Sequence, residues 1–300
     1  MSVKEKKIGF YPGCSLEGTS REYKESVKSL AGKFDIILEE VTDWNCCGAT
    51  AAHNLNKELS VALPARIIVQ AEKAGMTNIL VPCAACYNRL SVTLHELQND
   101  KLLKAKVEEI VGSPIIATLR ILNLIQFVNE YILPELKEKI TDPFTNKVAC
   151  YYGCLLVRPQ GVLNFDRQED PQSMDEVMKA LGAETIDWPF KTECCGAGFS
   201  VSRMNVVTRL SGKILEDATE RGAGAIIVAC PMCHSNLDMR RKDIEKYLGK
   251  KLDIPVLYLS QAIGMAIGIP EAGTGIHRHF VKVNNEMTCH ARQSIKTVED

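Results

Sequence analysis

The sequence predicts an α/β protein built from two related domains, and two observations support that prediction. Stretches typical of short buried strands alternate with stretches typical of amphipathic helices, a pattern that predicts parallel βαβ units. One arrangement of cysteines also occurs twice, with the copies about 145 residues apart, which is too long a period for a solenoid. A chain of 300 residues can hold two domains of ordinary size. We expect a first domain over residues 1–140, a second over 141–270 and a C-terminal tail over 271–300.

In the first domain, turn residues separate the expected elements. The Pro-Gly pair at residues 12–13 ends the first strand, and Gly75 is placed to end a long helix. The expected strands cover residues 7–11, 35–41, 78–81 and 114–117. The expected helices cover residues 19–31, 55–74, 101–111 and 121–131, with one more from the segment 83–86 to about residue 97. Residues 141–146 are the expected connector between the domains.

The second domain repeats this order with one insertion. The expected strands cover residues 148–152, 184–187, 225–229 and 254–257. The expected helices cover residues 173–180, 206–221 and 260–267. Between Cys154 and Ser173 the second copy holds a loop that the first copy lacks, and the residues from Glu271 onward have no counterpart.

Ten of the twelve cysteines form the repeated arrangement: a single cysteine, then Cys-Cys-Gly, then Cys-x-x-Cys. The first set is Cys14, Cys46, Cys47, Cys83 and Cys86, and the second set is Cys154, Cys194, Cys195, Cys230 and Cys233. Doublet and pair are separated by 35 residues in the first copy and by 34 in the second. In each copy three expected strands end at cysteines, and ligands of open α/β sheets gather outside the carboxyl ends of the strands. We therefore expect five thiols to converge on one site in each domain, at the strand ends.

Repeated cysteines in a reducing compartment are more often metal ligands or redox centres than disulfides. The N-terminus lacks the apolar core of a signal peptide, so we expect a cytoplasmic protein. Structural zinc and a cubane 4Fe–4S cluster each need only four cysteines. Five thiols with a contiguous doublet fit an extended iron–sulfur cluster better, since adjacent cysteines can bind neighbouring irons, and soft thiolates favour iron–sulfur or zinc. Zinc at one of the two sites remains an alternative.

The repeated pattern resembles the CCG domain, and a chain with two such domains and no ferredoxin module resembles the B-type subunits of heterodisulfide reductase. The segments that carry the resemblance most closely are residues 187–198, which contain Cys194-Cys195-Gly196, and residues 230–234. The resemblance covers about residues 7–269 and implies a fold of two CCG domains related by a pseudo-twofold axis.

The resemblance also implies cofactors, a reaction and partners. It implies two non-cubane 4Fe–4S clusters, one for each set of five cysteines, which face each other across the domain interface. The implied reaction is the reduction of a disulfide bound between them, in methanogens the mixed disulfide of coenzymes M and B. The implied partners are the A-type subunit of the reductase, which contains flavin and iron–sulfur clusters, and its small iron–sulfur C-type subunit, in complexes that include flavin-based electron bifurcation.

Other residues are weaker candidates. His234 directly follows Cys233 and is a possible proton donor, although a supporting hydrogen bond to the cluster region is an equal alternative. Arg158 and Arg203 follow Cys154 and Cys195 and are candidates for binding an anionic substrate group, with surface salt bridges as the alternative. Cys150 is expected to be a core thiol. The tail residues His277, His279, Cys289 and His290 are a possible but weak zinc site, and His53 and His95 are assigned structural roles.

Composition excludes some classes of function and leaves three. A net charge of −1 without a basic run argues against nucleic-acid binding. No apolar stretch reaches the roughly 18 residues of a membrane span.

The first hypothesis is a disulfide-reducing enzyme, because splitting S–S takes two electrons and two one-electron centres match that number. The second is an iron–sulfur subunit that only transfers electrons within a lactate-, glycolate- or fumarate-linked dehydrogenase. The third is a zinc-stabilised binding module. The sequence does not identify the disulfide.

Overall fold

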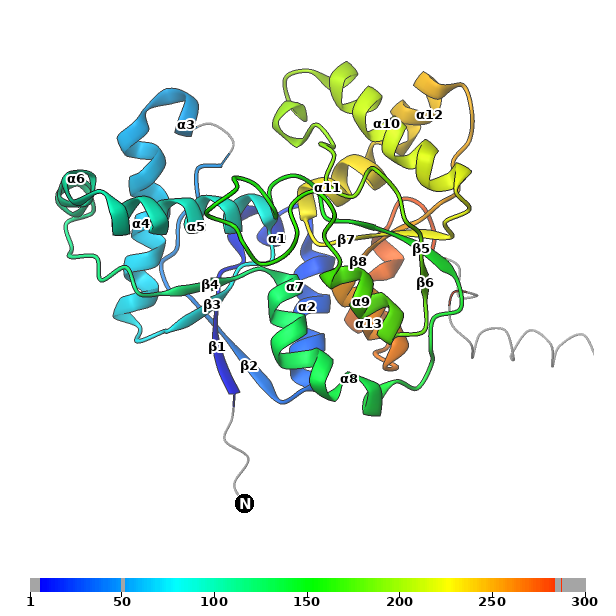
Figure 1. Ribbon diagram of the computed structural model, residues 1–300, viewed down its shortest axis with the longest axis horizontal. Helices are drawn as coiled ribbons and strands as arrows, with labels where there is room; N and C mark the ends of the chain where they lie inside the picture. Colours follow the sequence, from blue (N-terminus) through cyan, green and yellow to red (C-terminus); the bar gives the residue numbers. More distant parts are fainter. Residues whose placement is uncertain (1–5, 50–51, 284–286, 288–300) are drawn as a thin grey trace, which may run out of the picture.

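The computed structural model describes residues 6–49, 52–283 and 287, and it consists of two halves with the same topology (Figure 1). Each half contains a four-stranded sheet whose strands are all parallel, in the order β2-β1-β3-β4 in the first half and β6-β5-β7-β8 in the second. The strands are β1 (Lys6–Phe10), β2 (Ile36–Glu40), β3 (Asn78–Leu80), β4 (Arg120–Leu122), β5 (Lys147–Tyr151), β6 (Glu184–Thr185), β7 (Ala225–Val228) and β8 (Val256–Tyr258). The predicted α/β class with two related domains is confirmed.

Helices connect the strands and cover both sheets, as parallel sheets require. The helical segments of the first half are α1 (Gly13–Glu17), α2 (Arg21–Lys33), α3 (Ala52–Leu55), α4 (Lys57–Lys73), α5 (Ala84–Asn99), α6 (Lys101–Val111), α7 (Leu124–Phe127), the π-helix η1 (Val128–Ile132) and α8 (Leu133–Lys139). Those of the second half are α9 (Ser173–Ala180), η2 (Ala197–Phe199), α10 (Met204–Glu220), α11 (Pro231–His234), the π-helix η3 (Ser235–Met239), α12 (Arg241–Leu248), α13 (Leu259–Ala266), α14 (Glu271–Thr274) and η4 (Ile276–Arg278).

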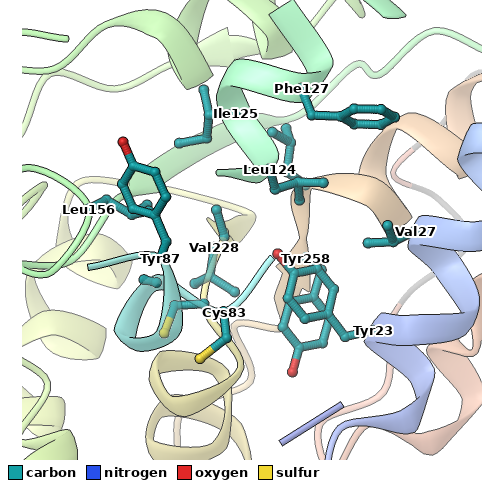
Figure 2. Close-up of a cluster of buried hydrophobic side chains, with 14 of the residues drawn as sticks. Tyr23, Val27, Cys83, Tyr87, Leu124, Ile125, Phe127, Leu156, Val228 and Tyr258 are labelled. Atoms are coloured by element: carbon teal, nitrogen blue, oxygen red, sulfur yellow. The ribbon is translucent and has the colours of Figure 1, made fainter. Parts of the chain in front are cut away.

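The two halves share one hydrophobic core because a helix that follows the last strand of each half packs against the other half. Helix α13, which follows the last strand of the second half, packs against α2 of the first half, and η1 and α8 pack against α9. At the first of these contacts the buried hydroxyls of Ser26 and Ser260 lie 2.7 Å apart. The rings of Tyr23 and Tyr258 stack there with centroids 3.9 Å apart, and Figure 2 shows this stack beside Cys83.

The strand expected at residues 114–117 is wrong, because the strand of this region is β4, a few residues later. The amides of residues 115–117 are bound by carboxylates instead: Glu108 accepts from Ile115 at 2.9 Å, and Glu72 accepts from Ile116 and Ala117 at 3.0 and 2.8 Å. The next helix accordingly begins at Leu124 and not at residue 121, since Asn123 caps it in a capping box with Gln126.

Two further features of the second half differ from the expectation. Helix α12 was not expected, although it is the counterpart of α6. Residues 271–283 were expected to belong to a tail, yet they form α14 and η4 and bury Thr274, Ile276 and His279. The buried carboxylate of Asp238 fixes this segment, because it accepts the amides of Phe280 and Val281 at 2.8 and 3.0 Å. In the part of the chain that the structure describes, no helix has the length and apolarity to cross a membrane.

Candidate metal centre

The second set of cysteines surrounds a single cavity of about 260 Å³. The set comes from three segments: Cys154 follows β5, the doublet forms the turn after β6, and the last two cysteines lie at the start of α11. All five line this cavity: Cys154, Cys194, Cys195, Cys230 and Cys233. The other lining residues are apolar or aromatic, among them Ala84 and Ala85 from the first half and Met232. The sulfur atoms of Cys195 and Cys233 lie 3.6 Å apart.

The first set is arranged in the same way. Cys14 lies in α1, the doublet forms the turn after β2, and Cys83 and Cys86 stand at the N-terminus of α5. The sulfur atoms of Cys47 and Cys86 lie 3.2 Å apart. In both sets the second cysteine of the doublet and both cysteines of the Cys-x-x-Cys pair are buried, whereas the first cysteine of the doublet is exposed. Each site therefore has a buried wall of three sulfurs and a more open side.

Glycines make room for the sulfurs at both sites. Gly13 and Gly153 precede the first cysteine of each set and have φ values of +67° and +70°. A Cβ atom at either position would stand 3.1 Å from the sulfur of Cys86 or Cys233. Both the positive φ and the close approach therefore require glycine. In the sequence, Gly13 indicated only the turn that ends the first strand, and its closeness to a sulfur atom was not predicted.

Those later glycines turn the doublets. Gly48 and Gly196 have φ values of +74° and +82°, in the left-handed region. Their amides point to the first sulfur of each doublet, at 3.4 Å from Cys46 Sγ and 3.3 Å from Cys194 Sγ. The same turn is thus built twice, with one backbone donor aimed at a sulfur that is otherwise exposed.

A buried tyrosine supports each doublet, and sequence reasoning missed both. Tyr11 donates its hydroxyl to the carbonyl of Asn45 at 2.9 Å, and Tyr151 donates to the carbonyl of Glu193 at 2.6 Å. The accepting residue directly precedes the doublet in each case. Burial, followed by the nearby cysteine thiols, raises the pKa of both tyrosines, so that each stays a neutral donor. The available signal was a tyrosine three residues before the first cysteine in both copies.

Hydrogen bonds among the thiols favour thiolates within each set. Bonds from the Cys46 and Cys86 thiols lower the pKa of Cys47 to about 4. A bond from Cys154 lowers the pKa of Cys194 to about 6. Both sets therefore contain a thiolate at neutral pH, which is the form that binds metals.

The two sites touch each other at the centre of the molecule. Ala84 and Ala85, which stand between Cys83 and Cys86 of the first site, line the cavity of the second site. Across this boundary Cys230 raises the pKa of the Cys83 thiol, and Cys83 contributes to the lowered pKa of Cys230. The stacked pair of Tyr23 and Tyr258 lies next to Cys83 (Figure 2). Tyr23 donates its hydroxyl to the carbonyl of Pro82 at 3.3 Å. The five-cysteine site of one half thus adjoins that of the other.

This donor set fits an iron–sulfur group better than a single ion. The second set spreads five soft sulfur donors around an apolar cavity, which is one donor more than a tetrahedral zinc ion takes and is the chemistry that iron–sulfur clusters take.

The weaker candidates lie away from the second cysteine cavity. His234 is buried with its Nε2 3.2 Å from the carbonyl oxygen of Val256, and its ring stacks on Tyr258. Arg158 is exposed and pairs with Glu169 at 3.5 Å, and Arg203 is exposed at the start of α10. None of the three lines the cavity. Their roles as proton donor and anion-binding residues stay predictions.

The remaining candidates are placed as follows. Cys150 is fully buried on β5, and burial raises the pKa of its thiol. His277 is exposed, whereas the buried His279 has its Nε2 3.0 Å from the amide nitrogen of Gln261. His95 lies on α5. Cys289, His290 and the side chain of His53 lie outside the described residues.

Two stretches of the chain, residues 8–91 and 148–238, match the CCG family of cysteine-rich domains. The chain belongs to this family. Its two CCG domains contain all ten repeated cysteines. The B-type subunit of the ferredoxin/F(420)H(2)-dependent CoB-CoM heterodisulfide reductase of Methanosarcina acetivorans is 31% identical over 283 residues, which cover 92% of this chain and 94% of that protein. The predicted resemblance to such subunits is confirmed.

Other relatives have different names. The 8-methylmenaquinol:fumarate reductase membrane anchor subunit of Wolinella succinogenes is 29% identical over 281 residues, which cover 92% of this chain and 98% of that protein. A solved structure of a hypothetical protein from Helicobacter pylori shares the fold, with a TM-score of 0.78 and 14% identity. It matches 93% of this chain, which spans about half (52%) of that protein.

Proposed function

We propose that this protein is the disulfide-reducing iron–sulfur subunit of a heterodisulfide reductase-type complex. The overall reaction is R–S–S–R′ + 2 e⁻ + 2 H⁺ → R–SH + R′–SH, in which the disulfide is reduced and an electron-donor protein is oxidised. The observation that carries the proposal is that the two five-cysteine sites adjoin, because Ala84 and Ala85 from the first Cys-x-x-Cys segment line the cavity of the second set. A disulfide held at this boundary would be within reach of both sites, and each site would need to supply one electron only.

We propose one non-cubane 4Fe–4S cluster for each set of five cysteines. Bound there, the clusters would supply the electrons and a Lewis acid for the sulfur atoms that become thiolates. The rest of the work belongs to the chain. The ten cysteines hold the clusters, Tyr11 and Tyr151 fix the doublet turns, and the apolar cavity wall excludes water from the second site.

The proposed partners follow from the relatives. Relatives of this chain are named as subunits of heterodisulfide reductases and of a fumarate reductase. We propose an assembly in the cytoplasm with an A-type subunit that contains flavin and iron–sulfur clusters and with a small iron–sulfur C-type subunit. The mixed disulfide of coenzymes M and B is one substrate of the required kind.

Anaerobic purification with metal analysis tests the cofactor. The proposal predicts about eight irons and eight sulfides per chain. One or two zinc ions without iron would support the zinc-stabilised module instead. The same preparation, given an artificial electron donor, should reduce disulfides in a screen of candidate substrates, and proteins that co-purify identify the complex.

A second candidate is an electron-transfer subunit of a fumarate-linked dehydrogenase. The observation that favours it is the 29% identity with the Wolinella succinogenes subunit over 98% of that protein. Co-purification of a flavoprotein with fumarate reductase activity would support it, if no disulfide in the screen is reduced.

A further inference from the structure

A second, outer cavity opens beside the second cysteine site. It has a volume of about 410 Å³ and lies between the α1–α2 turn of the first half and α11 with η3 of the second half. We call it the interdomain groove. The lining residues used below are Ser15, Thr19, Met232, Asn236, Arg240 and Phe280.

The groove carries one kind of charge. Among the described residues that line it, Arg240 is the only charged one, and no described carboxylate forms an ion pair with its guanidinium. The guanidinium donates one hydrogen bond, to the carbonyl of Ser200 at 3.2 Å, which leaves other donors unused. Ser15 and Thr19 add hydroxyls, and the exposed ring of Phe280 adds apolar surface. This combination fits an anionic group on an apolar chain.

The groove adjoins the second cysteine site through two residues. Met232 lines both the groove and the cysteine cavity, so its flexible side chain forms the partition between them. Asn236 is buried, and its amide donates to the carbonyl of Cys195 at 3.1 Å and approaches the sulfur of that residue at 3.7 Å. A molecule in the groove is therefore separated from the cysteine cavity by one methionine side chain.

The corresponding position on the other side of the molecule is filled by the chain itself. Ser235 in the groove corresponds to Asn88, which is two residues after Cys86 in the first half. Asn88 donates to the carbonyls of Leu155, at 3.0 Å, and of Arg158, both in the inserted loop of the second half. The insertion thus covers one side of the pseudo-twofold pair, and the groove marks the side that it leaves open.

We propose that the interdomain groove binds the anionic arm of the substrate and that Arg240 selects for it. The substrate class is a disulfide with a carboxylate, sulfonate or phosphate on one arm, which reaches the second cysteine site past Met232. This inference rests on the proposed function, because it takes a disulfide to be the substrate. The binding it describes can be measured without turnover.

Calorimetry on the cluster-loaded protein, without an electron donor, tests the binding. The probe is 3,3′-dithiodipropionate, a dianionic disulfide, and bis(2-hydroxyethyl) disulfide is its neutral counterpart. Arg240→Gln should weaken binding of the dianion about tenfold, because a charge-assisted bond is lost, and should reduce the preference for the dianion over the neutral disulfide. Arg240→Lys should restore part of the affinity. Lys242→Gln removes a neighbouring exposed charge outside the groove and is the matched control.

The outcomes separate the two proposals. Unchanged affinity of Arg240→Gln for the dianion, or an equal loss in Lys242→Gln, overturns the groove inference. Absence of any binding by the wild-type protein also overturns it. Binding that depends on Arg240, in a protein that reduces no disulfide, overturns the proposed function and leaves the groove as an anion-binding site.

Discussion

The two cysteine sites of this protein are alike where they hold sulfur atoms and different where they are covered. Both use the same glycine before the first cysteine, the same doublet turn and the same tyrosine hydroxyl. The segments that cover the two sites are unrelated. The insertion, residues 155–172, lies on the helix that follows the first Cys-x-x-Cys pair, and residues 271–283 lie on the helical segment that follows the second pair. The duplicated framework therefore repeats the five-cysteine arrangement, and the added segments cover its two copies differently.

Small side chains explain part of this difference. The cavity of the second site is bounded on the first-half side by Ala84 and Ala85, the middle residues of the first Cys-x-x-Cys pair. Their counterparts, Pro231 and Met232, face α1 and the residue after Cys14. Larger side chains thus stand near the first site at the positions where alanines leave space beside the second.

The equivalence of the two cysteine sites would be refuted most clearly if only one of them were needed for activity. Cys86→Ala and Cys233→Ala are equivalent changes, and each removes a buried sulfur from one site. If both sites act on one disulfide, either variant should lose more than about a hundredfold in turnover with an artificial donor. Iron analysis checks that the untouched site stays loaded. Substantial activity in either variant would refute the paired mechanism and favour a chain of electron carriers.

Substitution of the glycine before the first cysteine should be equally damaging in both halves. Gly13→Ala and Gly153→Ala each place a Cβ about 3.1 Å from a sulfur at a positive φ. We expect a loss of about 1–3 kcal/mol in the free energy of unfolding and reduced iron at the altered site. Denaturant unfolding and iron content measure the two effects. Gly222→Ala is the control, since it has a positive φ of +76° but no atom within 4 Å of an added Cβ. Equal iron loss in all three would mean that backbone strain, and not the contact with sulfur, is responsible.

The inserted loop, residues 155–172, is held on the first half by the side-chain amide of Asn88. Asn88→Ala removes the bonds to the carbonyls of Leu155 and Arg158, so the unfolding free energy should fall by about 1–3 kcal/mol. Limited proteolysis should then cut the inserted loop faster. Ser235→Ala changes the equivalent position in the open groove, where the described residues form no such bond, and should have little effect on either measurement. Similar losses in both variants would show that the covers do not differ as described.

The repeat made the fold class and the convergence of the cysteines predictable, because the apolar stretches of β3 and β7 lead directly to the two Cys-x-x-Cys pairs and the same order of strands recurs in both halves. The errors lie where side chains override local propensity. Residues 115–117 have strand-forming side chains, but Glu72 and Glu108 bind their amides. Residues 271–283 look like a polar tail, but Asp238, more than 30 residues earlier, fixes them. Such long-range polar contacts have no periodicity that a single sequence could reveal, and the groove beside Arg240 depends on them.

The smallest effect should come from the paired tyrosines. Tyr11→Phe and Tyr151→Phe remove one hydroxyl each and leave the carbonyl of Asn45 or Glu193 without that donor. The free energy of unfolding should fall by about 1 kcal/mol in both. The larger loss is expected for Tyr151, because its bond is shorter, at 2.6 Å against 2.9 Å, and its side chain is buried as completely. Urea unfolding measures the stability, and the absorption of the bound clusters reports on the doublet turns. Tyr247→Phe, on an exposed ring of α12, is the control. Loss of stability in only one of the paired variants would mean that the two halves use this tyrosine for different purposes, although its geometry is the same in both.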